Sequence, residues 1–203
     1  MDWQLKDKVA LVTGGGRGIG KAVALKLAEH GVHVGICGRT QATLEEAADE
    51  LRQFGVRAWP IVADVTSEAA VQSFIDTVAA EAGRLDIMVN NAVSSFYAPF
   101  AEQTDDHWRH HLDVKLMAYI RSARMVQPHM EAAGGGRIVN VGGMTARIVA
   151  AHRITNGVVN AGVANFTKQL SAQVGGNNIT VNCVHPGFTA TDRMLSGTRR
   201  RAE

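Results

Sequence analysis

A glycine-rich segment near the N-terminus, TGGGRGIG at residues 13–20, has the residue types and spacing of a phosphate-binding loop. It follows the β-branched run VALVT and leads into a helical pattern, KAVALKLAEHG. Glycines let main-chain N–H groups approach an anion closely, and a helix N-terminus adds partial positive charge. The segment therefore predicts pyrophosphate binding, the alternative being a tight strand–helix turn without a ligand. The expected contacts are Gly14, Gly16, Arg17, Gly18, Ile19 and Gly20.

A cation follows the second apolar run, where Arg39 comes directly after HVGICG. In dinucleotide-binding folds an acidic residue near this point accepts hydrogen bonds from the adenosine ribose. A guanidinium instead suits a 2′-phosphate, and Arg17 adds a second cation on that side. We therefore expect NADP(H) in preference to NAD(H), with a solvated surface arginine as the alternative for Arg39.

Short apolar runs alternate with segments of helical period, and these elements must position the loop. The expected strands are residues 9–14, 31–38, 56–64, 85–91, 137–143 and 179–187. Helical spacing joins Leu44, Ala48, Leu51 and Phe54, and later Val71, Phe74, Ile75 and Val78. Alternating strands and helices imply right-handed crossovers and a parallel sheet. We expect an α/β fold in one domain: a doubly wound parallel sheet of the Rossmann type, in three layers.

The composition excludes several classes of function. The 203 residues carry a net charge of +2, which gives no reason to expect nucleic acid or a membrane surface as partner. The basic C-terminal run TRRRAE is expected to be a solvated tail or loop. Cys37 and Cys183 show no metal-ligand spacing and are expected to be buried free thiols. No metal is expected, and the lack of a signal-peptide pattern predicts a cytoplasmic protein.

TGGGRGIG, together with NNA at residues 90–92 and HPGFTATD at residues 185–192, resembles the short-chain dehydrogenase/reductase family over nearly the whole chain. The stretch ADVTS at residues 63–67 is similar to that family's adenine-contacting segment. The resemblance implies a small-molecule substrate and a homodimer or homotetramer. It also implies further cofactor contacts from Asp64, Val65, Asn91, Ala92, Pro186, Gly187 and Thr189.

The chain departs from the family pattern in two further places. Val93 stands where the family usually has glycine after the asparagine pair. The chain is expected to form one NAD(P)-binding domain over residues 1–203 that lacks the family's last strand.

The proton-transfer residues that the resemblance implies are all different in this chain. Family members use an asparagine in a proton relay, a serine that steadies the carbonyl, a tyrosine that passes the proton, and a lysine that lowers the tyrosine pKa and holds the ribose. The matching positions here are Lys115, Gly143, Asn156 and Asn160. No change of register restores the usual set, because the two tyrosines are Tyr97 and Tyr119. A carboxamide cannot transfer a proton near neutral pH.

Several other side chains are candidates for a compensating role. Lys115 either replaces the missing ammonium or is an exposed helix lysine. His152, just before the helix that carries Asn156, is a possible stand-in acid or a surface histidine. Further candidates, for which packing or loop roles are the default, are Tyr97, Tyr119, His185, Ser94 and Ser95.

Three functions are compatible with these residues. The first is an NADP(H)-dependent oxidoreductase of the short-chain type with weak or altered carbonyl/alcohol chemistry. The second is a catalytically inactive NADP(H)-binding sensor or scaffold subunit. The third is a non-redox enzyme, such as a lyase or an isomerase, since a fold does not fix its chemistry.

Overall fold

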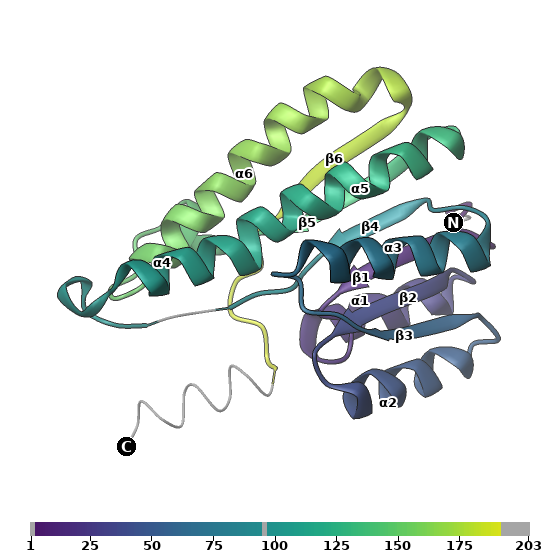
Figure 1. Cartoon of the computed structure of the whole chain (residues 1–203), viewed down its shortest axis with the longest axis horizontal. Coiled ribbons are helices and arrows are strands. Elements are labelled where there is room, and N and C mark those ends of the chain that lie inside the picture. Colours follow the sequence, from purple (N-terminus) through teal and green to yellow (C-terminus); the bar gives the residue numbers. More distant parts are fainter. Residues whose placement is uncertain (1–2, 95–96, 192–203) are drawn as a thin grey trace.

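Six strands form one parallel sheet in the spatial order β3-β2-β1-β4-β5-β6 (Figure 1). The structure is a computed structural model, and it describes residues 3–94 and 97–191. The strands match the predicted runs, with small differences at their ends. They are β1 (Val9–Thr13), β2 (His33–Gly38), β3 (Ala58–Val62), β4 (Ile87–Asn90), β5 (Gly136–Val141) and β6 (Ile179–Val184).

The direction in which strands are added reverses between β1 and β4. From β1 the chain proceeds outward to β2 and β3, and it then returns so that β4 pairs with the other edge of β1. In open α/β sheets ligands bind beyond the carboxyl ends of the strands at such a reversal. The prediction of a doubly wound Rossmann-type sheet is therefore confirmed, and the reversal indicates where its site lies.

Helices cover both faces of the sheet and make three layers (Figure 1). One face packs on α1 (Gly18–Glu29) and α2 (Gln41–Arg52), and the other on α3 (Glu68–Ala82), α5 (Ala118–Ala132) and α6 (Ile154–Val174). Successive side chains of a strand point to opposite faces. Ala10 and Val12 therefore join the core beneath α1 and α2, while Val9 and Leu11 join the other core.

The end of α2 differs from the prediction. Its other predicted apolar positions are buried, but the helix ends at Arg52 and the Phe54 ring is exposed. Gly55 follows with a φ of +75°, a backbone conformation that suits glycine and ends the helical path. Phe54 lies in this turn, so its assignment to the apolar helix face was wrong.

The helical segment that precedes β5, from Asp105 to Ala132, is divided into three consecutive pieces. They are α4 (Asp105–His111), the π-helical turn η2 (Leu112–Met117) and α5. A π-turn inserts an extra residue into the helix and commonly marks a functional position. Here it carries Lys115. Three short 3₁₀ turns are also present: η1 (Phe100–Glu102), η3 (Met144–Ala146) and η4 (Gly175–Asn177).

Candidate functional site

The predicted cofactor residues gather at the carboxyl edge of the sheet. The glycine-rich segment forms the turn from β1 into α1, and Arg39 follows β2. Asp64 and Val65 follow β3, Asn91 and Ala92 follow β4, and Pro186, Gly187 and Thr189 follow β6. Residues far apart in the sequence therefore meet at one edge, as parallel strands require.

The glycine-rich turn is shaped by close backbone contacts. Gly14 and Gly18 have φ values of +66° and +56°. A Cβ on Gly20 would lie 2.2 Å from the carbonyl oxygen of Gly14, so only glycine fits there. Helix α1 begins at Gly18, and the Arg17 side chain does not cap it. Main-chain N–H groups in the first turn of a helix that receive no side-chain cap are suited to bind an anion.

A hydrogen-bond clamp joins this turn to the end of β4. The Thr13 hydroxyl accepts from the main-chain N–H groups of Asn91 (2.9 Å) and Ala92 (3.1 Å). In return the Asn91 amide donates to the carbonyl oxygens of Thr13 (3.0 Å) and Gly14 (3.2 Å). The asparagine of the NNA motif therefore holds the glycine-rich turn in place.

Charged residues occupy the corner beyond β2 and β3. The Asp64 carboxylate accepts hydrogen bonds from the Thr66 N–H (2.9 Å) and hydroxyl (2.8 Å). The Thr66 N–H does most to hold the pKa of Asp64 below its usual range, and the nearby charge of Arg39 acts in the same direction. Arg39 is exposed at this corner, where it can meet an anionic group.

The four positions matched to the family's catalytic residues also come together, between the end of β5 and the first turns of α6. Asn156 and Asn160 lie one turn apart on the buried side of α6. A Cβ on Gly143 would lie 2.6 Å from the Asn160 amide nitrogen, so these two residues are in close contact. The Lys115 ammonium reaches the neighbouring residue, donating to the Gly142 carbonyl at 2.9 Å.

Lys115 is buried, with 4% of its surface exposed. Its reading as an exposed helix lysine was therefore wrong. The π-turn of η2 directs the side chain toward the end of β5, where the ammonium is held by a main-chain carbonyl. The ammonium is therefore bonded to the residue just before Gly143, which contacts Asn160.

The two asparagines leave polar atoms without partners. The side-chain oxygens of Asn156 and Asn160 are buried and accept no hydrogen bond from the described residues. The Asn160 amide nitrogen donates to the Thr145 hydroxyl at 2.8 Å. A buried acceptor without a donor costs about 1–3 kcal/mol, so these oxygens favour a site filled by a hydrogen-bonding ligand or water.

His185 and Cys183 line the other side of this cluster. The His185 Nδ1 lies 3.1 Å from the Gly143 nitrogen and 3.0 Å from its oxygen, and the ring fills the space that a Gly142 side chain would need. The Cys183 sulfur lies 3.6 Å from His185 Nε2. Burial raises the pKa of Cys183, so the thiol is not activated. Cys37 is buried, but Cys183 is only partly buried, contrary to the prediction.

The remaining stand-in candidates have structural contacts. The His152 ring packs edge-on against Tyr97, with centroids 5.4 Å apart, and its carbonyl accepts from the Ala98 N–H. Tyr119 is buried and donates to the carbonyls of Ala92 and Val141, and burial raises its pKa well above the usual value. These contacts favour packing roles. Ser94 follows β4, and Ser95 lies outside the described residues.

Thr145 was missed by reasoning from the sequence. It lies in η3, two residues after Gly143, and its hydroxyl contacts Asn160 across fifteen positions of the chain. The signal available in the sequence was that Thr145 carries a hydroxyl only two residues after Gly143, which stands at the family's serine position.

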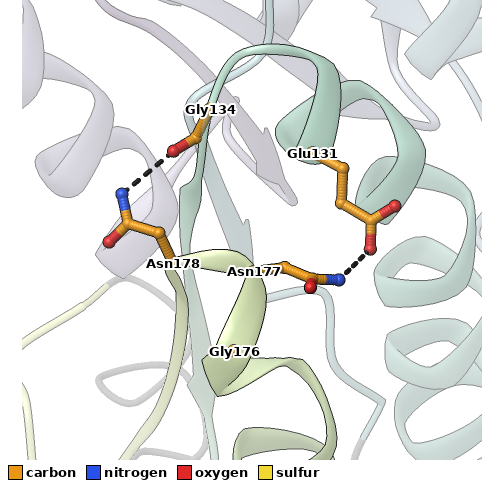
Figure 2. Close-up of a pocket in the computed structure, with 5 residues that line it drawn as sticks. All are labelled: Glu131, Gly134, Gly176, Asn177 and Asn178. Carbon is orange, nitrogen blue, oxygen red and sulfur yellow. Dashed lines mark hydrogen bonds between the residues drawn. The ribbon is translucent and has the colours of Figure 1, made fainter.

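A hollow at the opposite end of the strands is separate from this site (Figure 2). It has a volume of about 430 Å³ and is lined by Glu131, Gly134, Gly176, Asn177 and Asn178. Asn177 donates to the Glu131 carboxylate, and Asn178 donates to the Gly134 carbonyl. The lining residues precede β5 and β6, so the hollow opens at the amino ends of these strands.

Residues 3–94 and 97–191 contain no cluster of three or more His, Cys, Asp or Glu side chains arranged to hold a metal ion. None of their helices has the length and apolar character needed to cross a lipid bilayer.

Comparison with known proteins gives the same family as the motifs. Residues 8–201 match the family model of the short chain dehydrogenases. The short-chain reductase protein NovJ of Streptomyces niveus is 37% identical, over 92% of this chain and 71% of its own length. The 3-oxoacyl-[acyl-carrier-protein] reductase FabG of Pseudomonas aeruginosa is 34% identical, over 98% of this chain and 81% of its own.

A solved structure is similar over the whole chain. L-Sorbose reductase from Gluconobacter frateurii, in complex with NADPH and L-sorbose, superposes with a TM-score of 0.97 at 32% identity. The match covers 100% of this chain and 77% of that one. On these grounds, and on the glycine-rich turn and sheet order described above, the chain belongs to the short chain dehydrogenase family of oxidoreductases.

Proposed function

We propose that this oxidoreductase binds NADP(H) in preference to NAD(H) at the carboxyl edge of the sheet. The observation that carries the proposal is the turn from β1 into α1, where Gly20 packs against the Gly14 carbonyl and the first N–H groups of the helix are uncapped. Arg39 supplies a cation at the adenosine corner, suited to a 2′-phosphate. The NADPH found with L-sorbose reductase supports the same choice of nucleotide.

The chemistry that follows from this cofactor is carbonyl/alcohol redox, and we propose that it is slow. NADPH, when bound, supplies a hydride to a carbonyl carbon, and the carbonyl oxygen then needs a proton. Asn156 and Asn160 can hold an oxygen or a hydroxyl in place but cannot supply that proton. General acid–base catalysis raises the rate about 10²–10⁴-fold, and a site whose side chains are amides lacks most of this increase.

Lys115 is proposed to restore part of the missing positive charge. Its ammonium is buried and is fixed on the Gly142 carbonyl, one residue from the Gly143–Asn160 contact. In such a place a cation stabilises a nearby ribose hydroxyl or developing negative charge more strongly than it would in water. The Asn160 side-chain oxygen, which is buried, accepts no hydrogen bond from the described residues.

A second candidate function is a catalytically inactive NADP(H)-binding sensor or scaffold subunit. It is favoured by the same two buried amide oxygens, which recognise hydrogen-bond donors on a ligand without changing them chemically. Assembly as a homodimer or homotetramer and a cytoplasmic location remain predictions for either function.

Fluorescence titration with NADPH and NADH, followed by assay against a broad carbonyl panel, tests the proposal. We expect saturable binding of both nucleotides, with NADPH bound about tenfold more tightly. Turnover is expected to be well below the typical enzyme value of about 10 s⁻¹. Binding with no turnover at all supports the sensor function, and failure to bind either nucleotide contradicts both.

A further inference from the structure

Thr145 presents a hydroxyl within the cluster formed by Gly143, Asn156 and Asn160. We propose that this hydroxyl donates a hydrogen bond to the oxygen of a carbonyl ligand, the task for which Gly143 has no side chain. This role rests on the proposed function, and Thr145 lies outside the motifs that the chain shares with the family.

The hydrogen bond from Asn160 leaves the Thr145 proton available. The Asn160 amide donates to the hydroxyl oxygen at 2.8 Å, so this oxygen is an acceptor in that contact. A hydroxyl that accepts one bond still has its own O–H to donate. Accepting from an amide also polarises the O–H and makes it a better donor.

The position of η3 places this hydroxyl beside α6. The Thr145 carbonyl lies 3.4 Å from the point that a Gly157 Cβ would occupy, so η3 packs on the turn of α6 between Asn156 and Asn160. Any side chain at position 143 would collide with the Asn160 amide, whose nitrogen is 2.6 Å from the Cβ point. The Asn160–Thr145 pair therefore occupies the space next to Gly143.

Other buried hydroxyls on α6 are less suited to meet a ligand. The Thr167 hydroxyl donates to the Val163 carbonyl and accepts from Asn140, so its proton is already used within the protein. Thr155 is fully buried. Thr145 is only partly buried, in contrast to both of these residues.

The proposed role is donation and not proton transfer. A threonine hydroxyl stays protonated near neutral pH, so it polarises the carbonyl and stabilises the oxygen as negative charge develops. In the complete reaction the hydride supplied by NADPH bonds to the carbonyl carbon, and the C=O π-electrons move to oxygen. That oxygen takes a proton from water, giving alcohol, NADP⁺ and hydroxide, which the buffer neutralises.

The test compares Thr145→Val, which removes the hydroxyl at nearly constant shape, with Thr145→Ser, which restores it. Thr77→Val makes the same change on the exposed face of α3 and is the matched control. With NADPH and cyclohexanone, Thr145→Val is expected to lower kcat about 10- to 100-fold. Thr145→Ser and Thr77→Val should remain near wild type, and all variants should bind NADPH within about twofold.

A second readout does not require turnover. In the complex with NADP⁺ the C=O stretch of bound ¹³C-labelled cyclohexanone is expected at higher frequency in Thr145→Val than in wild type, because the donor is lost. Equal frequencies, equal kcat values, or no cyclohexanone binding to the wild-type NADP⁺ complex would overturn the inference. NADPH titration separates a failure of the Thr145 role from a failure of the proposed function. If the protein binds NADPH but the Thr145 variants behave like wild type, only the role of Thr145 is excluded.

Discussion

The two halves of the sheet differ in how they are built to meet a ligand. On the β1–β3 side the groups proposed to bind the cofactor are mostly main-chain N–H groups, placed by the glycines of the β1–α1 turn. On the β4–β6 side the matching positions depend on side chains, and there the chain presents Lys115, Asn156 and Asn160. A site made from backbone persists as long as its glycines persist. A site made from side chains changes its chemistry with each substitution.

The halves are nevertheless joined mechanically. Asn91 and Ala92, at the end of β4, bond to Thr13 at the end of β1. The glycine-rich turn is thus held by Thr13, Asn91 and Ala92, and none of these residues belongs to the cluster of Gly143, Asn156 and Asn160. We therefore expect changes in this cluster to alter chemistry and leave the turn intact.

The largest effect on turnover is expected from restoring the family's four catalytic residues on the β4–β6 side. A variant with Lys115→Asn, Gly143→Ser, Asn156→Tyr and Asn160→Lys should raise carbonyl turnover about 10²–10⁴-fold, because it regains a general acid. NADPH oxidation over a carbonyl panel measures it.

Gly143→Ser alone is the matched control, since its side chain meets the Asn160 amide and no acid is supplied. A rebuilt variant that binds NADPH but is no faster than wild type would show that the amides are not what limits the rate.

NADPH binding by the β1–α1 turn is tested most directly by a substitution at Gly20. Gly20→Ala places a methyl group against the Gly14 carbonyl, 2.2 Å from its oxygen, and should weaken NADPH binding about 10- to 100-fold. Gly175→Ala, in open space at a φ of −58°, is the control and should bind normally. Unaltered NADPH affinity in Gly20→Ala, measured by titration, would argue against binding at this turn.

The choice between nucleotides is tested at Arg39. Arg39→Ser should weaken NADPH binding about tenfold and leave NADH binding nearly unchanged, because only NADPH carries the 2′-phosphate. Arg124→Ser, an exposed arginine on α5, should change neither affinity. Equal losses for both nucleotides would assign Arg39 a general electrostatic role in place of phosphate recognition.

The contribution of the buried ammonium is tested by Lys115→Met, which keeps the length of the side chain and removes its charge. We expect about fivefold weaker NADPH binding, since a partly desolvated cation interacts strongly with a nearby nucleotide. Lys168→Met, on the exposed face of α6, is the control. Identical affinities for Lys115→Met and wild type would remove the compensating role.

The smallest effect concerns the junction of the halves at Asp86. Its carboxylate accepts from the Val9 N–H at 2.9 Å and from Arg84. Burial alone would raise its pKa, but the bonds from Arg84, Val9 and Lys8 outweigh burial and lower the pKa. A pKa lowered by folding stabilises the native state above the unfolded-state value, and this stability is lost as pH falls through the native value.

Asp86→Asn should therefore lower Tm at about pH 7 by about 2–6 °C and flatten the decline of Tm toward about pH 3. Thermal unfolding followed by circular dichroism measures both changes. A parallel decline of Tm in variant and wild type would exclude Asp86 as a source of acid sensitivity.

The fold was largely predictable because its signals are local. Apolar runs and the glycines that end them predicted six strands, and alternation with helices predicted their parallel pairing. The glycine-rich turn was predictable for the same reason, since strand, turn and helix are consecutive in the chain. Phe54 was misplaced because helical spacing alone does not show where a helix ends.

The side-chain site was predictable only in part, because its contacts are distant in sequence. The burial of Lys115 depends on the π-turn of η2, which the apolar pattern does not reveal. The pairing of Thr145 with Asn160 depends on how η3 packs on α6. His185, for which packing was the default role, does pack, but its partner is the backbone of Gly143, a contact between distant residues that two consecutive glycines make possible.

One stopped-flow experiment tests the central claim that nucleotide binding is kept while proton transfer is poor. Excess protein is mixed with NADPH and a saturating ketone, and nucleotide fluorescence is followed over time. We predict a rapid, saturable change from binding, followed by NADPH oxidation slower than about 0.1 s⁻¹. Absence of the binding phase, or oxidation at about 10 s⁻¹, would contradict the claim.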